Sequence, residues 1–248
     1  MTEAKFNGLA DSYERVRPRY PSALLTFAVR LTGVPASVVD TGAGTGIALE
    51  ALLPLLSPGT VVDAVDISTD MVRIGRDKFP SVRWHVGGAE SFLEGRKDVN
   101  LVLAAQAYQW MDRPRFLRAA RAALRPGGVC AVVQNNRHHE AGGFIAEYEE
   151  LLEKYSPGYG RHYRAIDVVG EFAQVFAEVQ EQRETWEQSM TVEEFVTMSS
   201  SSTQAQRAIS SIGPSFLDHV RDLARGHERD GRVRIPYVSE GFYGIAGQ

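Results

Sequence analysis

Short apolar runs alternate with helical patterns over residues 37–134, and this alternation restricts the fold more than any other feature of the chain. The runs are apolar on both faces, which is typical of strands covered by helices on each side of a mainly parallel sheet. Pro80 and the group 126–128 (Pro-Gly-Gly) end two of the helical patterns, because proline lacks the backbone N–H that a helix needs. The pattern predicts an α/β fold with strands at 37–40, 60–66, 82–86, 99–104 and 129–134 and helices at 47–56, 68–79 and 113–124.

The second half of the chain is less regular. Four consecutive serines, 199–202, indicate a junction between helices. Residues 232–243 carry alternating β-type residues, and we expect them to form a late antiparallel strand at the sheet. Because no linker divides the chain, a single domain over residues 1–248 is favoured over two domains. The other expected elements are helices at 144–155 and 166–176, a strand at 178–188, and a helical apolar spacing over 203–225.

A glycine-rich turn joins the first expected strand to the first helix. In the segment VVDTGAGTGI, residues 38–47, glycines stand at positions 42, 44 and 46. Glycines at the carboxyl end of a parallel strand let the backbone approach a ligand closely. A dinucleotide-binding turn of the form GxGxxG would need glycine at position 47, where this chain has Ile47. The GxGxG spacing therefore predicts a ligand without a pyrophosphate and disfavours an NAD-dependent dehydrogenase.

An acidic residue ends the second expected strand. Asp66 follows Gly46 by 20 residues and closes the run VVDAVD. A carboxylate at this position can accept hydrogen bonds from both hydroxyls of a ribose, each worth roughly 1.5–3 kcal/mol. Asp63 lies inside the same strand and is the competing acid, but the ligand must sit at the strand's carboxyl end. The turn and Asp66 together predict an adenosyl ligand.

Composition limits the classes of partner. The net charge of −4 and the pI near 5.9 provide no basic stripe for nucleic acid. The single cysteine, Cys130, lies in an apolar run, so an intrachain disulfide is excluded and no metal cluster is suggested. No apolar stretch approaches the roughly 20 residues that span a bilayer, and residues 1–21 lack the apolar segment of a signal peptide. We expect a cytoplasmic monomer or homodimer without nucleic-acid or membrane partners.

Several motifs together resemble the class I S-adenosylmethionine-dependent methyltransferases, over residues 5–135. The segment VVDTGAGTG resembles the family's first motif and VDIS its second, and Gly88-Ala89-Glu90 resembles the turn that contacts adenine. LAAQAYQWMD, residues 103–112, and LRPGGVCAVV resemble the segments around strands four and five. YERVRPRYP at 13–21, SMTVEEFVTMSSSS and RIPYVSEGFYG are similar to segments of the trans-aconitate methyltransferase-like group. These relatives often have histidine where this chain has Gln109.

The resemblance implies a Rossmann-like fold with a seven-stranded, mostly parallel sheet and a late antiparallel strand. It also implies a helical N-terminal lid over residues 1–36, a cofactor-binding core over 37–135, and helices and final strands covering the substrate over 136–248. The implied cofactor is S-adenosylmethionine. For Met71 a core position, for Gln106 a polar strand cap and for Tyr20 an aromatic anchor are competing interpretations. The residues expected to bind the cofactor are Tyr13, Arg17, Tyr20, Gly42, Ala43, Gly44, Gly46, Asp66, Ile67, Met71, Ala89, Glu90 and Gln106.

The acceptor side is defined more weakly. Tyr108, His138 and His139 are the candidate catalytic residues, because they follow strands four and five at the ligand-binding edge. A histidine here could act as a general base, although a solvated loop histidine is the commoner case. Adjacent histidines lack the spacing of a metal pair, so no metal is expected. The candidate substrate residues are Gln109, Trp110, Arg137, Arg161 and His162.

The expected activity is methyl transfer to a small molecule, with O-methylation of a carboxylate or hydroxyl favoured. Arg137, Arg161 and Arg164 favour an acidic acceptor. The alternatives are N- or C-methylation of a specialised metabolite on the same frame, and a module that binds S-adenosylmethionine without transferring the methyl group. Fold alone does not decide among these activities.

Overall fold

A seven-stranded sheet forms the centre of the computed structural model, which describes residues 17–162 and 166–247. The strand order is β3-β2-β1-β4-β5-β7-β6, and β7 is antiparallel to both of its neighbours. The other pairings, β1 with β2 and β4, β2 with β3, and β4 with β5, are parallel. The predicted mostly parallel sheet with a late antiparallel strand is therefore confirmed. The strands are β1 Ser37–Thr41, β2 Val61–Asp66, β3 Arg83–Val86, β4 Val99–Ala105, β5 Leu124–Arg137, β6 Glu178–Met190 and β7 Val233–Ile245.

Helices cover both faces of this sheet, as expected for strands that are apolar on both sides. On one face, Leu24 and Leu25 of α2 and Leu49 of α3 are fully buried. On the other face, Phe116 of α6 and Phe172 of α8 are fully buried. The helices of this part are α2 Ser22–Thr32, α3 Ile47–Leu52, η2 Leu53–Leu55, α4 Thr69–Lys78, α5 Ala89–Leu93, η3 Tyr108–Trp110, α6 Arg113–Ala123 and α8 Val168–Ala173.

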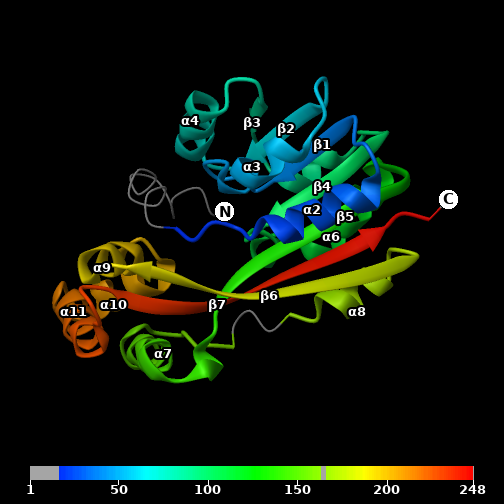
Figure 1. Ribbon diagram of the computed structural model, residues 1–248. Helices are drawn as coiled ribbons and strands as arrows, with labels where there is room; N and C mark the ends of the chain where they lie inside the picture. The colour runs from blue at the N-terminus through cyan, green and yellow to red at the C-terminus, as the bar shows by residue number, and fades with distance from the viewer. Residues whose placement is uncertain (1–16, 163–165, 248) are drawn as a thin grey trace.

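The helices of the second half form a separate cluster. Figure 1 shows α7, α9, α10 and α11 gathered around one end of the long strands β6 and β7, and we call these four helices the helical cap. Their apolar faces meet in a core that contains Phe144, Phe195, Phe216 and Val220. The predicted helical insert after strand five is thus present, beginning at η4. The bounds are η4 His139–Ala141, α7 Gly143–Tyr155, α9 Val192–Ser200, α10 Thr203–Ile212 and α11 Ser215–His227.

Some boundaries differ from the sequence prediction. The helical spacing over 203–225 is divided into two helices, because Gly213 adopts a φ of 78° and Pro214 follows it. The serines at 199–202 do form a helix junction, where Ser202 caps α10 by accepting a hydrogen bond from the Ala205 N–H. Of the lid expected over residues 1–36, the structure describes residues from Arg17 onward, and α2 within it packs on the sheet. None of the described helices is long and apolar enough to cross a membrane.

Candidate active site

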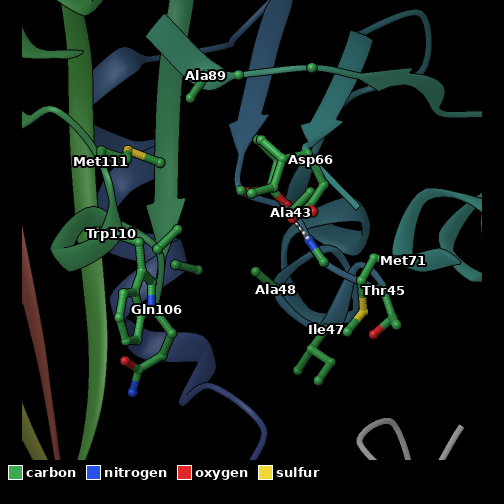
Figure 2. Close-up of a pocket in the computed structure, with 18 of the residues that line it drawn as sticks. Ala43, Thr45, Ile47, Ala48, Asp66, Met71, Ala89, Gln106, Trp110 and Met111 are labelled. Carbon is green, nitrogen blue, oxygen red and sulfur yellow. Dashed lines mark hydrogen bonds between the residues drawn. The ribbon is translucent and has the colours of Figure 1, made fainter. Parts of the chain in front are cut away.

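A cavity of about 280 Å³ opens at the carboxyl ends of β1, β2 and β4. This position is where parallel α/β sheets bind ligands, beside the point at which strand order reverses between β1 and β4. In Figure 2, Gln106, Trp110 and Met111 approach the cavity from the β4 side, opposite Ile47 and Met71. We call this space the first cavity. Its lining includes Tyr20, Asp40, Gly42, Ala43, Gly44, Thr45, Ile47, Asp66, Ile67, Met71, Ala89, Glu90, Gln106, Trp110 and Met111.

The glycine turn borders this cavity with two of its three predicted glycines. Gly42 and Gly44 line it and have positive φ angles of 64° and 56°. A Cβ atom on Gly42 would lie 2.5 Å from the Ala107 Cβ, so the turn and the loop after β4 approach each other too closely for a side chain. Gly46 does not line the cavity: it precedes α3, and a Cβ there would meet the Phe79 ring at 2.9 Å. The expected ligand role of Gly46 is therefore corrected to a packing role.

Asp66 is directed at the glycine turn. Its Oδ2 accepts a hydrogen bond from the Gly44 N–H at 2.9 Å, drawn in Figure 2, and its Oδ1 accepts one from the Ser68 N–H at 2.8 Å. Burial raises the pKa of the carboxyl group, and the two backbone hydrogen bonds lower it. The competing acid, Asp63, is buried, is hydrogen-bonded to His85 and forms an ion pair with Arg96, outside the cavity lining. Of the two acids of β2, Asp66 is thus the one that lines the cavity.

A second carboxylate at the cavity was not selected by the sequence analysis. Asp40 ends the apolar run of β1, is fully buried, and lines the first cavity. Neither of its carboxylate oxygens has a hydrogen-bond partner among the described residues. Burial, and secondarily the charge of Asp66, raise the pKa of Asp40 to about 8. In the sequence, the signal for Asp40 was its position at the end of an apolar strand, directly before the glycine turn. An acid in such a position is expected to be buried, and a buried charge needs a partner.

The far end of the first cavity is more apolar. Ile67, a 39% exposed side chain, and Met71 line it together with Ala89 at the start of α5. Glu90 also lines it, and its Oε1 accepts a hydrogen bond from the Asp112 N–H at 2.9 Å. A flat, partly polar ring fits this combination of apolar side chains and a nearby carboxylate.

A second cavity of about 110 Å³ adjoins the first and shares four lining residues with it: Tyr20, Ile47, Gln106 and Trp110. The remaining lining is mainly polar. It comes from segments far apart in the sequence, including the junction between α9 and α10, so the serine run is part of this wall. We call this space the second cavity. Its other residues are Arg17, Pro18, Gln109, Asn135, Arg137, Met198, Ser199, Ser202, Thr203, Gln204 and Tyr237.

Arg137 is held rigidly in this second cavity. Its Nε donates a hydrogen bond to Oε1 of Glu149 at 2.7 Å, and its guanidinium lies 5.1 Å from the centre of the Tyr148 ring. Glu149 is buried and also accepts a hydrogen bond from the Tyr159 hydroxyl. Burial disfavours the charged form of Arg137, but Glu149 raises its pKa well above the ordinary value, so the side chain stays cationic.

The structure does not bring the candidate catalytic residue Tyr108 to either cavity. Its side chain is fully buried against Phe116 and Phe172, and its hydroxyl donates a hydrogen bond to Glu171. Burial, the first cause, raises its pKa further from neutrality. Tyr108 thus points into the core from η3, and its side chain is not among those that line the cavities.

The candidates after β5 also lie outside the two cavity linings, with the exception of Arg137. The His139 ring contacts His162 with 5.6 Å between ring centres, while the backbone N–H of His138 donates to a β7 carbonyl. Arg161 forms an ion pair with Glu153 at 2.6 Å. These interactions connect η4 and α7 with the loop after α7, and the side chains of His138, His139, Arg161 and His162 are not among those that line the cavities. Tyr13 and Arg164 lie outside the described residues.

No group of three or more His, Cys, Asp or Glu side chains in the described ranges is arranged to hold a metal ion. The polar groups around the two cavities are instead suited to an organic ligand. Two carboxylates, a glycine turn and an apolar end surround the first cavity, while amides, hydroxyls and arginines surround the second.

Comparison with known proteins agrees with this architecture. A family model described as a methyltransferase domain matches residues 38–128. An uncharacterized methyltransferase of Mycobacterium tuberculosis is 28% identical over 94% of this chain and 92% of its own length. A trans-aconitate 2-methyltransferase of Deinococcus radiodurans is 34% identical over 51% of this chain and 48% of its own length. The structure of a type II methyltransferase from Anaeromyxobacter dehalogenans has the same fold, with a TM-score of 0.73, 23% identity, and coverage of 93% of this chain and 98% of that one. The family model, the relatives and the fold together support an S-adenosylmethionine-dependent methyltransferase.

Proposed function

We propose that this enzyme transfers the methyl group of S-adenosylmethionine to a small acidic molecule, forming a methyl ester. The observation that carries the proposal is the shared wall between the two cavities. A ligand in the first cavity and a ligand in the second would meet at Tyr20, Ile47, Gln106 and Trp110.

The lining residues of the first cavity support binding of the cofactor. Asp66 retains acceptor capacity for ribose hydroxyls beyond its two backbone hydrogen bonds, since a carboxylate has about four acceptor positions. Asp40 has two unpartnered oxygens, and the ammonium group of the methionine part, which Gly42 and Gly44 allow to approach, would stabilise its ionised form on binding. Ile67, Met71, Ala89 and Glu90 would border the adenine.

The second cavity supports a small, acidic acceptor. Its volume of about 110 Å³ is below the roughly 300–1,000 Å³ of typical sites for drug-sized ligands. Arg17 and Arg137 line it, and Arg137 makes no hydrogen bond through Nη1 or Nη2 with any described residue. Trans-aconitate, the acceptor named for the relative from Deinococcus radiodurans, is also a carboxylic acid.

The protein needs little acid–base chemistry for such a reaction. When bound, S-adenosylmethionine supplies a methyl group activated by a positive sulfur. The chain's contribution is to align the acceptor oxygen with that methyl group and to exclude water. A carboxylate is already ionised at neutral pH, and no histidine among the described residues lines either cavity. This favours a carboxylate over a hydroxyl or an amine, which would benefit from a base.

The test is a methyl-transfer assay with a panel of small mono-, di- and tricarboxylic acids, in which S-adenosylhomocysteine is measured with and without each acid. Removing Arg137 alone would leave Glu149 buried without its partner, at a cost of about 3–5 kcal/mol. The variant to use is therefore the double substitution Arg137→Gln/Glu149→Gln, which removes both charges. We expect its KM for the acid to rise at least about 10-fold, with cofactor affinity unchanged.

Arg161→Ala is the matched control, because Arg161 pairs with Glu153 away from the cavities. It should leave KM unchanged. An unchanged KM in the double variant, or product formed equally well without any acid, would contradict the proposal.

A further inference from the structure

Two glutamine side chains in the second cavity have their amide groups fixed by main-chain carbonyls. The Nε2 of Gln106 donates a hydrogen bond to the carbonyl of Asn135, and the Nε2 of Gln109 donates one to the carbonyl of Gln106 at 3.0 Å. A carbonyl oxygen can only accept, so in each amide the nitrogen must face the carbonyl. The opposite end of each side chain is therefore its oxygen.

Both of these amide oxygens lack a donor. The Oε1 atoms of Gln106 and Gln109 are buried, and neither has a hydrogen-bond partner among the described residues. Leaving a buried acceptor unpaired is unfavourable, and each such group calls for an explanation. The two residues thus present acceptors at a site to which a ligand can bring a donor.

The backbone reinforces this arrangement at Gln106. Gln106 has a φ of 53°, in the left-handed region that residues other than glycine rarely adopt. Its backbone N–H donates a hydrogen bond to the Val133 carbonyl at 2.8 Å. Such strained residues persist where the surrounding structure fixes them, and they cluster at functional sites. The orientation of the Gln106 carbonyl, and through it that of Gln109, is therefore built into the loop after β4.

The second cavity also offers an unused donor. Arg137 is anchored through Nε by Glu149, while its Nη1 and Nη2 make no hydrogen bond with the described residues. A ligand complementary to this cavity has an anionic group for Arg137 and a hydrogen-bond donor for the glutamine oxygens. A plain carboxylic acid meets only the first of these requirements.

We infer that the acceptor is a small carboxylic acid that also carries a hydroxyl or amino group, and that Gln109 recognises this donor. The inference rests on the proposed function and narrows its substrate class. Gln109 is the specificity residue because it lines only the second cavity, whereas Gln106 also lines the first.

The experiment compares acids that differ by one donor group: malate and aspartate against succinate, and 3-hydroxybutyrate against butyrate. S-adenosylhomocysteine formation is measured with each acid for the wild type, Gln109→Met and Gln109→His. The wild type should have a kcat/KM about 10- to 100-fold higher for the members that carry the donor. In Gln109→Met this ratio should fall to about 1, because the acceptor oxygen is lost while the side-chain volume is nearly kept.

Gln109→His is the rescue variant. A neutral imidazole has one donor for the Gln106 carbonyl and one acceptor for the ligand, so part of the preference should return. Cofactor affinity, measured by calorimetry, should be the same in all three proteins and shows that each is folded.

The outcomes separate the inference from the proposed function. If the wild type uses the unsubstituted acids as well as their hydroxyl or amino counterparts, or if Gln109→Met keeps the preference, the inference is wrong while acid methylation stands. If no acid is methylated, both are wrong. Comparing kcat/KM for malate and 3-hydroxybutyrate with kcat/KM for aspartate shows whether a hydroxyl or an amino group is the preferred donor.

Discussion

Replacing Asp40 with asparagine should change how the stability of this protein depends on pH. Asp40 is fully buried, and burial together with Asp66 raises its pKa from 3.8 to about 8. Between these two values the folded chain holds a proton on Asp40 that the unfolded chain has already released. The contribution of this group to stability is therefore complete below pH 3.8 and is lost as the pH rises toward 8.

The magnitude follows from the difference of one bound proton. The free energy of unfolding of the wild type should fall by about 1.4 kcal/mol per pH unit between these limits on account of Asp40 alone. Asparagine resembles the protonated aspartic acid and does not titrate. From pH 5 to pH 7 the wild type should thus lose about 3 kcal/mol relative to Asp40→Asn, and the variant should be the more stable protein at pH 7.

Urea unfolding followed by circular dichroism at constant ionic strength, in half-unit steps from pH 5 to pH 7, measures this difference. Asp77→Asn removes an exposed carboxylate and is the control for the loss of one charge. Parallel stability curves for the wild type and Asp40→Asn would refute the reasoning, because they would mean that Asp40 binds no extra proton in the folded state.

Three further substitutions test the geometry of the site. Asp66→Asn should weaken S-adenosylmethionine binding about 10- to 100-fold in calorimetry, because charge-assisted hydrogen bonds to the ribose are lost. An unchanged affinity would mean that Asp66 does not bind the ribose. Gly42→Ala should lower the thermal midpoint of unfolding more than Gly44→Ala. Both positions have a positive φ, but of these two only Gly42 has a neighbour with which the new methyl group would clash. Equal shifts of the midpoint would contradict this. Tyr108→Phe should leave kcat unchanged and reduce stability by about 1 kcal/mol, because the lost hydroxyl is hydrogen-bonded to Glu171 and lies outside the two cavity linings. A large loss of kcat in a fully folded variant would instead support a catalytic role.

The first cavity was predictable because its residues follow local patterns. A strand, a glycine turn and a strand-end acid lie within residues 38–66, and parallel strands deliver all of them to one edge of the sheet. The exceptions have physical causes. Gly46 has the same residue type and spacing as the other two glycines of the turn but faces the Phe79 ring. Asp40 is fully buried at the end of an apolar strand, a position that in other chains can equally hold a solvated acid.

The acceptor side was less predictable because its residues meet only in the folded chain. Arg17 donates a hydrogen bond to the Ser201 carbonyl, 184 positions away in the sequence. Arg137 and Arg161 look equivalent in the sequence, yet Glu149 holds the first in the second cavity and Glu153 holds the second outside it. Only the packing of α7 decides between them.

This division also determines how the enzyme can change its acceptor. The two cavities share four residues, and most of the second cavity is supplied by the helical cap, β5 and the segment beginning at Arg17. Substitutions at the α9–α10 junction or at Gln109 alter groups that contact the second cavity alone, so they change acceptor recognition without removing a group from the cofactor cavity. Gln106 and Trp110 lack this freedom because they border both cavities. Acceptor specificity should therefore be set in the cap and at position 109, on a cofactor-binding frame that can remain constant.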